Sequence, residues 1–571
     1  MQTKKKTGED DLVKALRSSS RGFFAAGFFS FFINILMLTA PLYMLQVYDR
    51  VVTSRSLETL LFLTLIMIFM FGVLGVLEWV RSRILVRVSN QLDQYMRHRV
   101  YTSMFDAGVK MPSRRTAQPL ADLNSIRQFM TGNGLFAFFD APWFPVYIGL
   151  LFVFHPAFGF FALGAGFILV IIAVLNEKMT KAMLSEANGE NVKAQGLANN
   201  NLRNAEVLHA MGMLPSIMGR WTHQHKAFLE KQTRASDRAG VFSNMSKVLR
   251  MIFQSAILGL GAYYVVKNEM TPGMMIAGSI LLGRALAPLD LMIGSWSGFN
   301  NARAARGRLR DLLDESPVDE RNMTLPVPEG RVIAENLFVA PPQTKLATLK
   351  QVNFVVDPGE LVGVIGPSAA GKSTLARAIL GIWPSTNGTL RIDGAEVQHY
   401  NRDEIGPHIG YLPQDIELFD GTVSENIARF GGVDPDKVVL AAQKAGVHDL
   451  ILQLPDAYDT KIGVDSGALS GGQRQRIGLA RALYDSPKVV VLDEPNSNLD
   501  EQGEQALSLT MAKLKEENVT AFVISHRTSI LKSIDKLMVL KDGQLQFFGP
   551  KDEVMQQLMA QKAAEGVQRG A

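Results

Sequence analysis

The sequence predicts an all-α membrane half, with six transmembrane helices and long cytoplasmic extensions, fused to an α/β domain of the P-loop class. Three observations predict this fold. Long apolar runs fill the chain up to about residue 300, and later apolar runs are short. Hydrophobic residues make up 47% of the chain and charged residues only 20%, which fits a protein with a membrane-embedded part. After residue 330, strand-like runs alternate with helical stretches, and one of them leads into the Gly-framed loop GPSAAGKST.

Six runs are apolar and long enough, or nearly so, to cross a bilayer, which takes about 20 residues of helix. The third and fourth are separated only by the first two residues of HPAF, a proline turn that predicts a helical hairpin. The stretches 81–134 and 177–245 look helical, and we expect them to extend the spanning helices into the cytoplasm. The six runs are 23–47, 57–77, 135–154, 157–175, 246–266 and 272–292.

The distribution of lysine and arginine among the loops predicts how the chain is oriented in the membrane. The first 22 residues hold six of them and the segment 81–134 holds nine, whereas the short loops on the other side hold only Arg50, Arg55 and Lys267. Because basic residues stay on the cytoplasmic side, we expect both termini and both long loops there. The net charge of +5 has the same explanation. No basic stripe interleaved with aromatic residues indicates nucleic-acid binding.

Two further sequence features exclude whole classes of chemistry and processing. Cysteine is absent, which excludes disulfides, thiolate metal sites and cysteine nucleophiles. The N-terminus starts basic but turns acidic and polar before any apolar run, and it has no small-residue cleavage site. A removed signal peptide is therefore not expected.

The stretch LVGVIGPSAAGKSTLARAIL predicts a buried strand, a loop and a helix. Its G-x4-G-K-S spacing, from Gly366 to Ser373, matches the P-loop motif. Glycines such as Gly371 let backbone N–H groups curl around phosphates, Lys372 reaches the β- and γ-phosphate oxygens, and Ser373 is placed for Mg²⁺. An ordinary Gly-rich turn is the alternative. The other predicted ATP-binding residues of this loop are Pro367, Ser368, Ala369, Ala370 and Thr374.

Two carboxylates end a second apolar run, KVVVLDEP. They are Asp493 and Glu494. Near a P-loop, the first would hold the metal through its water shell and the second would polarise an attacking water. Gln414 in YLPQD and His526 in FVISHR also follow apolar strands, and each is a weak signal by itself. Together with the P-loop, they predict that His526 contacts the γ-phosphate.

A second anion site is predicted in ALSGGQRQRIGLARAL. Ser470, Gly471, Gly472 and Gln473 open an amphipathic helix. A Ser-capped helix start without bulky side chains offers free N–H groups and a positive dipole end. One nucleotide cannot easily use both this site and the P-loop of the same domain. We therefore expect a head-to-tail homodimer, with each ATP between the P-loop of one chain and residues 470–473 of the other.

Together these motifs resemble a known family. GPSAAGKST, PQD, LSGGQRQR, VVVLDEP, SNLD and SHR are similar to the motifs of ABC transporter nucleotide-binding domains, and six spanning segments on the same chain resemble a half-exporter. The phrases LDEPNSNLD and APLYMLQVYDRVVTSRS are similar to the inner-membrane ATPases of type I secretion systems, in the branch that exports metalloproteases, lipases and other RTX-type proteins. The resemblance extends from about residue 20 to 555.

The resemblance implies an ATP-hydrolysing homodimer in the lipid bilayer of the bacterial inner membrane. Its partners would be a periplasmic adaptor (membrane fusion) protein, an outer-membrane channel protein, and an unfolded secreted protein with an uncleaved C-terminal signal. The implied organisation is a cytoplasmic N-terminal segment, a transmembrane domain, a linker, a cytoplasmic ABC nucleotide-binding domain and a tail. Their ranges are 1–22, 23–305, 306–329, 330–558 and 559–571.

The resemblance also implies roles for single residues, with ATP and Mg²⁺ as ligands. The implied roles are phosphate and Mg²⁺ contacts for Lys372, Ser373 and Thr374, Mg²⁺ support for Asp493, sensing of metal and attacking water for Gln414, general base for Glu494, a γ-phosphate contact for His526, contacts in trans for Ser470 and Gly472, and a dimer-interface position for Asp500.

The sequence departs from the family pattern at two places. Many exporters stack adenine on a Tyr, whereas this chain has Pro341 at that position with Phe338 nearby. The sequence therefore leaves open whether the site discriminates only weakly between ATP and GTP. Before the signature, Val464 stands where exporters often carry Glu, with Asp465 beside it. The link between nucleotide state and the opposite subunit's helices would then differ in detail.

Several interpretations stay open from sequence alone. Arg284 and Asp290 lie in the sixth run, where a charge costs about 2.5–3.5 kcal/mol. They line a polar translocation path, or they lie near the cytoplasmic interface or in an interhelical ion pair. Helices around 118–128 and 203–212 are candidates for transmitting nucleotide-domain closure. The rivals to protein export are a half-exporter of lipids or small amphiphiles and a membrane sensor that binds ATP without hydrolysing it.

Overall fold

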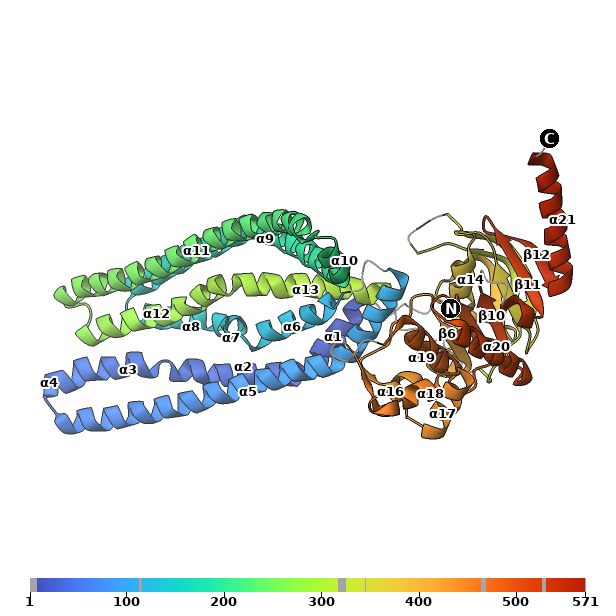
Figure 1. Ribbon diagram of the computed structural model, residues 1–571. Coiled ribbons are helices and arrows are strands. Elements are labelled where there is room, and N and C mark those ends of the chain that lie inside the picture. Colours follow the sequence, from blue (N-terminus) through green and yellow to red (C-terminus); the bar gives the residue numbers. More distant parts are fainter. Residues whose placement is uncertain are drawn as a thin grey trace. The chain divides into compact units, whose positions relative to one another are not determined.

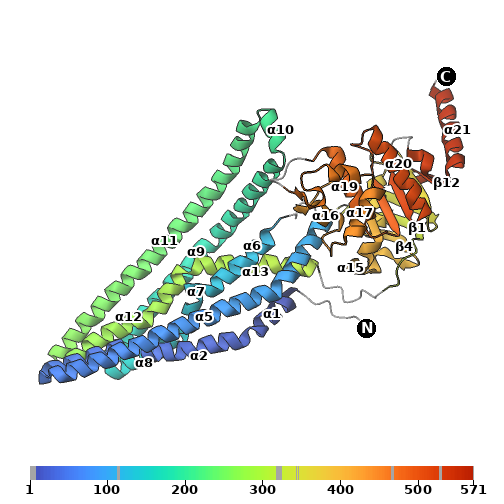
Figure 2. The same ribbon diagram turned by 60° about the horizontal axis from the view of Figure 1, so that its bottom comes forward.

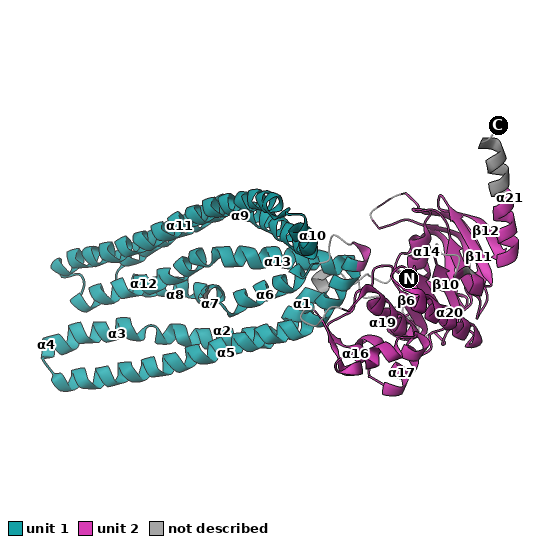
Figure 3. Cartoon of the chain, viewed as in Figure 1, with its two compact units in different colours: residues 1–108, 113–317 teal, residues 109–112, 318–571 magenta. Residues whose placement is uncertain are grey.

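The computed structural model describes residues 8–111, 116–316, 325–342, 344, 346–463, 469–525 and 530–569. Two compact units make up the chain (Figure 3). The first comprises residues 1–108 and 113–317, and the second comprises residues 109–112 and 318–571.

The described part of the first unit is helical throughout (Figure 1). Six helical segments in it are long and apolar enough to span a membrane, and each covers one of the six predicted runs. The predicted six-helix membrane half is therefore confirmed. The elements are α1 (Gly8–Ser18), α2 (Ser20–Leu36), α3 (Thr39–Gln46), the π-helix η1 (Val47–Val51), α4 (Val52–Ser54), α5 (Leu57–Lys110), α6 (Gln118–Thr131), α7 (Asn133–Asp140), the 3-10 turn η3 (Ala141–Trp143), α8 (Phe144–Phe154), α9 (Pro156–Arg203), α10 (Ala205–Ala210), α11 (Leu214–Val266), α12 (Pro272–Gly294) and α13 (Trp296–Glu315).

Three of these helices are much longer than a bilayer requires. Helix α5 has 54 residues, α9 has 48 and α11 has 53. At 1.5 Å per residue each is about 70–80 Å long, whereas the hydrocarbon core is about 30 Å thick. Helices α9 and α11 run side by side and are joined by the short α10 (Figures 1 and 2). The predicted helical extensions are thus present.

The predicted hairpin between the third and fourth spans is also present. Helix α8 ends at Phe154 and α9 begins at Pro156. His155 between them is extended, and its Nδ1 accepts a hydrogen bond of 3.1 Å from the N–H of Ala157. Because proline lacks an N–H and fixes φ, it suits the first position of α9.

A buried polar network joins α2, α5, α7 and α8. Asp140 accepts hydrogen bonds from Arg81 at 3.0 Å and from Asn34 at 2.9 Å, and the Tyr147 hydroxyl donates to the Asn34 side chain at 2.9 Å. Arg81 also lies 4.5 Å from the ring centre of Phe136. Since a buried charge is stable only when paired and hydrogen-bonded, these contacts fix the first three spans against one another.

The two charges of the sixth span have different surroundings. Asp290 accepts hydrogen bonds from Ser246 and from Arg250, both on α11. For Asp290 the interhelical ion pair is therefore the interpretation that the structure supports. Arg284 has an exposed side chain in this single chain.

Helix α13 continues ten residues into the stretch expected as a linker. Leu309, Leu312 and Leu313 of this stretch are buried, and Leu309 and Leu313 belong to a core shared with α1, α5 and α6. The i, i+3, i+4 spacing of these leucines gives the helix one apolar face, which explains why it continues to Glu315.

The second unit contains two main sheets. A six-stranded sheet has the order β12-β11-β3-β10-β9-β6, in which β12 alone is antiparallel to its neighbour, and a four-stranded antiparallel sheet has the order β2-β1-β4-β5. The described strands are β1 (Val332–Val339), β2 (Leu349–Val356), β3 (Leu361–Ile365), β4 (Ser385–Ile392), β5 (Ala395–Glu396), β6 (Ile409–Leu412), β7 (Gly421–Thr422), β8 (Lys461–Ile462), β9 (Val489–Asp493), β10 (Thr520–Ile524), β11 (Lys536–Lys541) and β12 (Gln544–Pro550).

Helices pack on both sides of the six-stranded sheet, as expected for an α/β fold whose parallel strands are buried. The described helices of this unit are α14 (Lys372–Ile379), α15 (Arg402–Ile405), α16 (Val423–Ile427), α17 (Pro435–Lys444), α18 (His448–Leu452), α19 (Gly471–Leu483), α20 (Glu501–Glu516) and α21 (Lys551–Arg569), with 3-10 turns η4 (Val397–His399), η5 (Gly406–His408), η6 (Ala457–Asp459) and η7 (Ile530–Ser533).

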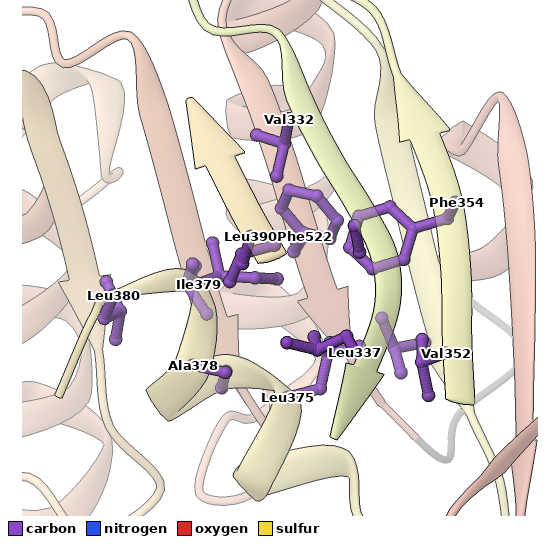
Figure 4. Close-up of a cluster of buried hydrophobic side chains, with 14 of the residues drawn as sticks. Val332, Leu337, Val352, Phe354, Leu375, Ala378, Ile379, Leu380, Leu390 and Phe522 are labelled. Carbon is purple, nitrogen blue, oxygen red and sulfur yellow. The ribbon is translucent and has the colours of Figure 1, made fainter. Parts of the chain in front are cut away.

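Helix α14 lies between the two sheets and fills the core there (Figure 4). Leu375 and Ile379 of α14 pack with Leu337 of β1 and with Phe354 and Phe522, whose ring centres are 6.1 Å apart. A second core on the other side of the sheet includes α19, α16, α17 and α20. Both faces of β9 and β10 are therefore covered, which matches their continuous apolar sequences.

Candidate nucleotide-binding site

The parallel strands bring most of the predicted site residues to one edge of the sheet. Strands β3, β10, β9 and β6 are parallel neighbours, so their carboxyl ends share an edge. The P-loop follows β3, Asp493 ends β9, and Gln414 lies two residues after β6. This is the edge at which open α/β sheets bind ligands.

The glycines of the P-loop are required by their surroundings. A Cβ on Gly366 would lie 2.2 Å from the carbonyl oxygen of Leu540. Gly371 has a φ of 101°, and a Cβ there would lie 2.8 Å from the Leu349 side chain. Ala369, with a φ of 65°, is also left-handed. The loop therefore keeps a tight turn before α14, with its backbone free of side-chain bulk.

Lys372 lies inside the loop that it follows. Its Nζ donates to the carbonyl oxygens of Gly366 at 2.9 Å and of Pro367 at 3.0 Å. Burial lowers the pKa of the Lys372 ammonium, and the carboxylates of Glu494 and Asp493 act in the opposite direction. The ammonium is thus held where polyphosphate oxygens could replace the two carbonyls.

Asp493 and Ser373 form the second part of the site. Asp493 is only 5% exposed, and this burial raises the pKa of its carboxyl, whereas a hydrogen bond from Ser373 lowers it. An oxygen-rich pair of a hydroxyl and a carboxyl suits a hard cation such as Mg²⁺. The donor set therefore fits the metal that the sequence predicts.

Glu494 has an unusual backbone and a specific partner. Its φ of 52° is left-handed, which is rare for a residue with a side chain. Its N–H donates to the carbonyl of Ile524 at 2.9 Å, and its Oε2 accepts from the Gln414 side-chain amide at 3.1 Å. Gln414 and Glu494, each predicted separately as a site residue, are therefore in contact.

The signature segment starts α19 as expected. The Ser470 hydroxyl accepts from the N–H of Gln473 at 3.2 Å, and the Gln473 side chain accepts from the N–H of Ser470 at 2.8 Å. This is a capping box, and Ser470 at the start of the helix is exposed. A Cβ on Gly472 would lie 2.9 Å from the carbonyl of Asn498, so glycine is required where the SNLD segment passes.

Gln475 is a site residue that is not among those predicted. Its side chain, 1% exposed, donates to the carbonyl of Glu494 at 3.2 Å and accepts from the N–H of Asn498 at 2.9 Å. Gln475 therefore joins the signature helix α19 to Glu494 and to the SNLD segment, which contains Asn498. Helical spacing could have indicated it, because Gln475 lies one turn before the buried Gly478 and Leu479.

The remaining predicted residues make contacts outside this cluster or lie outside the described part of the chain. Asp500 caps α20 by accepting from the N–H of Gly503 at 2.8 Å. His526 lies outside the described residues, as do Val464 and Asp465. Pro341 accepts a hydrogen bond of 2.9 Å from the Thr344 hydroxyl in a turn after β1, and Phe338 is half-buried.

Comparison with known proteins identifies the family. One family model, described as the ABC transporter transmembrane region, matches residues 23–287, and another, described as ABC transporter, matches residues 349–497. The type I secretion system ATP-binding protein PrsD of Rhizobium meliloti (strain 1021) is 43% identical over 561 residues, which cover 97% of this chain and 96% of that protein. The chain belongs to the ABC transporter family.

A more distant relative and a solved structure are also similar to this chain. The leukotoxin translocation ATP-binding protein LktB of Mannheimia haemolytica is 26% identical over 92% of this chain and 75% of its own length. The structure of a bacterial Atm1-family ABC exporter with ATP bound has a TM-score of 0.83 at 21% identity and covers 96% of this chain and 98% of its own. The exporter fold is thereby confirmed.

Membership in the family fixes the basic chemistry. This ABC transporter is a multi-pass membrane protein that binds ATP and couples its hydrolysis to transport. The predicted enzyme class is therefore confirmed, and the sensor that binds ATP without turnover is not supported.

Proposed function

We propose that this ABC transporter exports an unfolded protein across the bacterial inner membrane as the ATPase of a type I secretion system. The observation that carries the proposal is the 43% identity to a type I secretion ATP-binding protein over nearly the full length of both chains. The similarity to a leukotoxin translocation protein supports the same substrate class. The cargo would be a protein with an uncleaved C-terminal signal.

The working unit is a homodimer with two composite ATP sites. The P-loop and the signature segment each present backbone N–H groups, and the start of α19, where Ser470 is exposed, binds a nucleotide held by a second chain. In this arrangement Gly471 and Gly472 keep the helix start free of side chains, and Ser470 donates its hydroxyl to the phosphates. The nucleotide-binding domain spans about 330–558.

The catalytic roles follow from the edge of the sheet. Lys372 and the P-loop, including Ser368, Ala370 and Thr374, hold the phosphates, while Ser373, Asp493 and Gln414 provide the oxygens for Mg²⁺. When bound, Mg²⁺ neutralises phosphate charge during the transfer. Glu494 orients and deprotonates the attacking water, and Gln414 positions the Glu494 carboxylate. His526 contacts the γ-phosphate.

Closure of the nucleotide domains acts on the membrane half through α6 and α10. Helix α10, Ala205–Ala210, lies within the predicted 203–212 region, and α6 begins at Gln118, the start of the predicted 118–128 region. Beside α10 an apolar cavity of about 470 Å³ is lined by Leu208, Leu214 and Trp221, among others. An apolar surface of this kind suits docking onto another domain.

The adaptor and channel follow from the proposed secretion system. A periplasmic membrane fusion protein would contact the periplasmic helix ends, and an outer-membrane channel would complete the path. The substrate determines whether they are needed, because a lipid or small-molecule exporter would need neither.

Deletion and complementation in the native bacterium test the proposal. We expect deletion of this gene to remove at least one protein without an N-terminal signal peptide from the culture medium. The wild-type gene should restore it, and Glu494→Gln should not. An unchanged set of secreted proteins, with altered membrane lipids instead, would support the lipid exporter.

A further inference from the structure

Within the helical unit, a cavity of about 280 Å³, lined by both polar and aliphatic residues, lies between α9, α11 and the junction of α12 with α13. Asn176 and Thr180 of α9, Ser236 and Ser243 of α11, and Asn300 of α13 are among the residues that line it. Its volume is many times the roughly 10–15 Å³ that one water molecule needs. The site is therefore large enough for part of a polar ligand.

Three lining residues carry buried polar atoms without a hydrogen-bond partner among the described residues. They are the Asn176 side-chain oxygen, the Trp296 indole nitrogen and the Asn300 side-chain nitrogen. Asn176 is only 2% exposed. Leaving such an atom unpaired costs about 1–3 kcal/mol. One acceptor and two donors around the same cavity thus provide the pattern that a peptide group, with one N–H and one C=O, can satisfy.

A second cavity of about 240 Å³ continues from the first along α9 and α13. The two share Leu184 and Asn300, and the second adds the cations Lys181 and Arg303. No Asp or Glu is among the described residues that line either cavity. We call this combined surface the polar track, defined by Asn176, Thr180, Lys181, Ser243, Asn300 and Arg303.

We infer that the polar track binds an extended polypeptide segment of the cargo, neutral and polar at one end and acidic at the other. This inference rests on the proposed function. Along α9 the residues that line the two cavities run from Asn176 to Asn188, about 18 Å of helix, which about five extended residues can follow. The unpaired amides hydrogen-bond the peptide backbone, and Lys181 and Arg303 attract carboxylates.

A phospholipid headgroup fits the track less well. It would satisfy the two cations, but its tails would have to cross the neutral amide end. That end carries Asn, Ser and Thr side chains beside Leu184 and Ile293, and the unpaired polar atoms of Asn176, Trp296 and Asn300 favour a polar chain over lipid tails.

Single cysteines can test the track directly, because the natural chain has none. Gly240 lines the first cavity, and an added Cβ there meets nothing within 4 Å. Gly196 on α9 has equally open surroundings but lies outside both lining sets, so Gly196→Cys is the matched control. The probe is a peptide of about ten residues, rich in Asn, Ser and Gly, with a bromoacetyl group in the neutral part and Asp residues at one end. Free bromoacetamide measures the intrinsic reactivity of each thiol.

We expect the peptide-to-bromoacetamide rate ratio to be about tenfold higher at Gly240→Cys than at Gly196→Cys, because binding raises the local concentration of the reactive group. Adding Asn176→Leu should remove most of this advantage without changing the bromoacetamide rate. Replacing Lys181 and Arg303 by Glu should shift the preference to a Lys-ended peptide. Equal ratios at the two cysteines, or an advantage that survives Asn176→Leu, would overturn the inference.

The result is distinguishable from failure of the proposed function. If the deletion strain loses a secreted protein but the rate ratios are equal, protein export stands and only this site is wrong. If anionic lipid vesicles, but not the peptide, protect Gly240→Cys from bromoacetamide, the track is a lipid site and the inference is overturned.

Discussion

Glu494 combines a strained backbone with a hydrogen-bonded carboxylate. A left-handed φ of 52° at a residue with a side chain costs of order 1–3 kcal/mol, and such strain clusters at functional sites. The turn places Glu494 directly after the buried Asp493 while the Gln414 amide holds its Oε2. In the proposed mechanism, this strain helps two adjacent acids to perform different tasks.

Glu494→Gln should abolish steady-state ATP hydrolysis while ATP still binds. A positioned general base contributes about 10²–10⁴ in rate, and glutamine keeps the shape but cannot accept the proton. Phosphate release and equilibrium binding of labelled ATP measure the two effects. The control is Glu501→Gln at the exposed start of α20. Hydrolysis within about twofold of the wild type would contradict the assignment.

Gln475 should affect turnover through the position of Glu494 and the SNLD segment. Gln475→Leu keeps the volume but leaves the Glu494 carbonyl and the Asn498 N–H without their present partner. We expect kcat to fall about tenfold, with the KM for ATP changed much less, since the P-loop is untouched. A variant that raises KM and leaves kcat intact would show that Gln475 acts in binding instead.

Among the elements, the contact between the first and sixth spans is the most specific. Asp49, in the π-helical turn η1, accepts from the Thr271 hydroxyl at 2.6 Å and from the N–H of Gly273 at 2.8 Å. The carboxylate thus caps the start of α12, where the helix dipole favours negative charge. A Cβ on Gly273 would lie 2.5 Å from Asp49, so only glycine fits.

Gly273→Ala should therefore weaken the joint between these spans. The added methyl displaces the carboxylate, and we expect the midpoint of thermal unfolding in detergent to fall by a few degrees, the effect of about 1–3 kcal/mol. Gly259→Ala in α11, where an added Cβ meets nothing within 4 Å, is the control and should not lower it. An equal response of the two variants would contradict the role of the cap.

The elements could be predicted from sequence to different extents. The six spans and the strands before Gly366 and Asp493 were evident, because each is a continuous apolar run with a clear end. The continuation of α13 to Glu315 was not evident, because the charged residues of this helix outnumber the three leucines on its buried face. The order of the sheet strands and the contact of Gln475 with Glu494 depend on tertiary packing, which local patterns do not encode.

For the whole molecule, the dimer makes a prediction that a single-chain site does not. If each ATP lies between two chains, a mixed dimer of Lys372→Ala and Ser470→Arg chains has one site with both defects and one intact site. If each chain formed its own site, both would be defective. We expect the mixed dimer to occlude about one ATP, and each mutant homodimer to occlude almost none. Nucleotide counting in tandem-tagged mixed dimers measures this, and an empty mixed dimer would contradict the composite site.

The measurement that tests protein export most directly is capture of the ATP-trapped transporter. Glu494→Gln protein is held with ATP in its native membrane, purified in mild detergent, and its companions are identified by mass spectrometry. We predict a periplasmic adaptor and a secreted protein without a signal peptide. Recovery of the dimer with only lipid or a small molecule would contradict protein export and favour a small-substrate exporter.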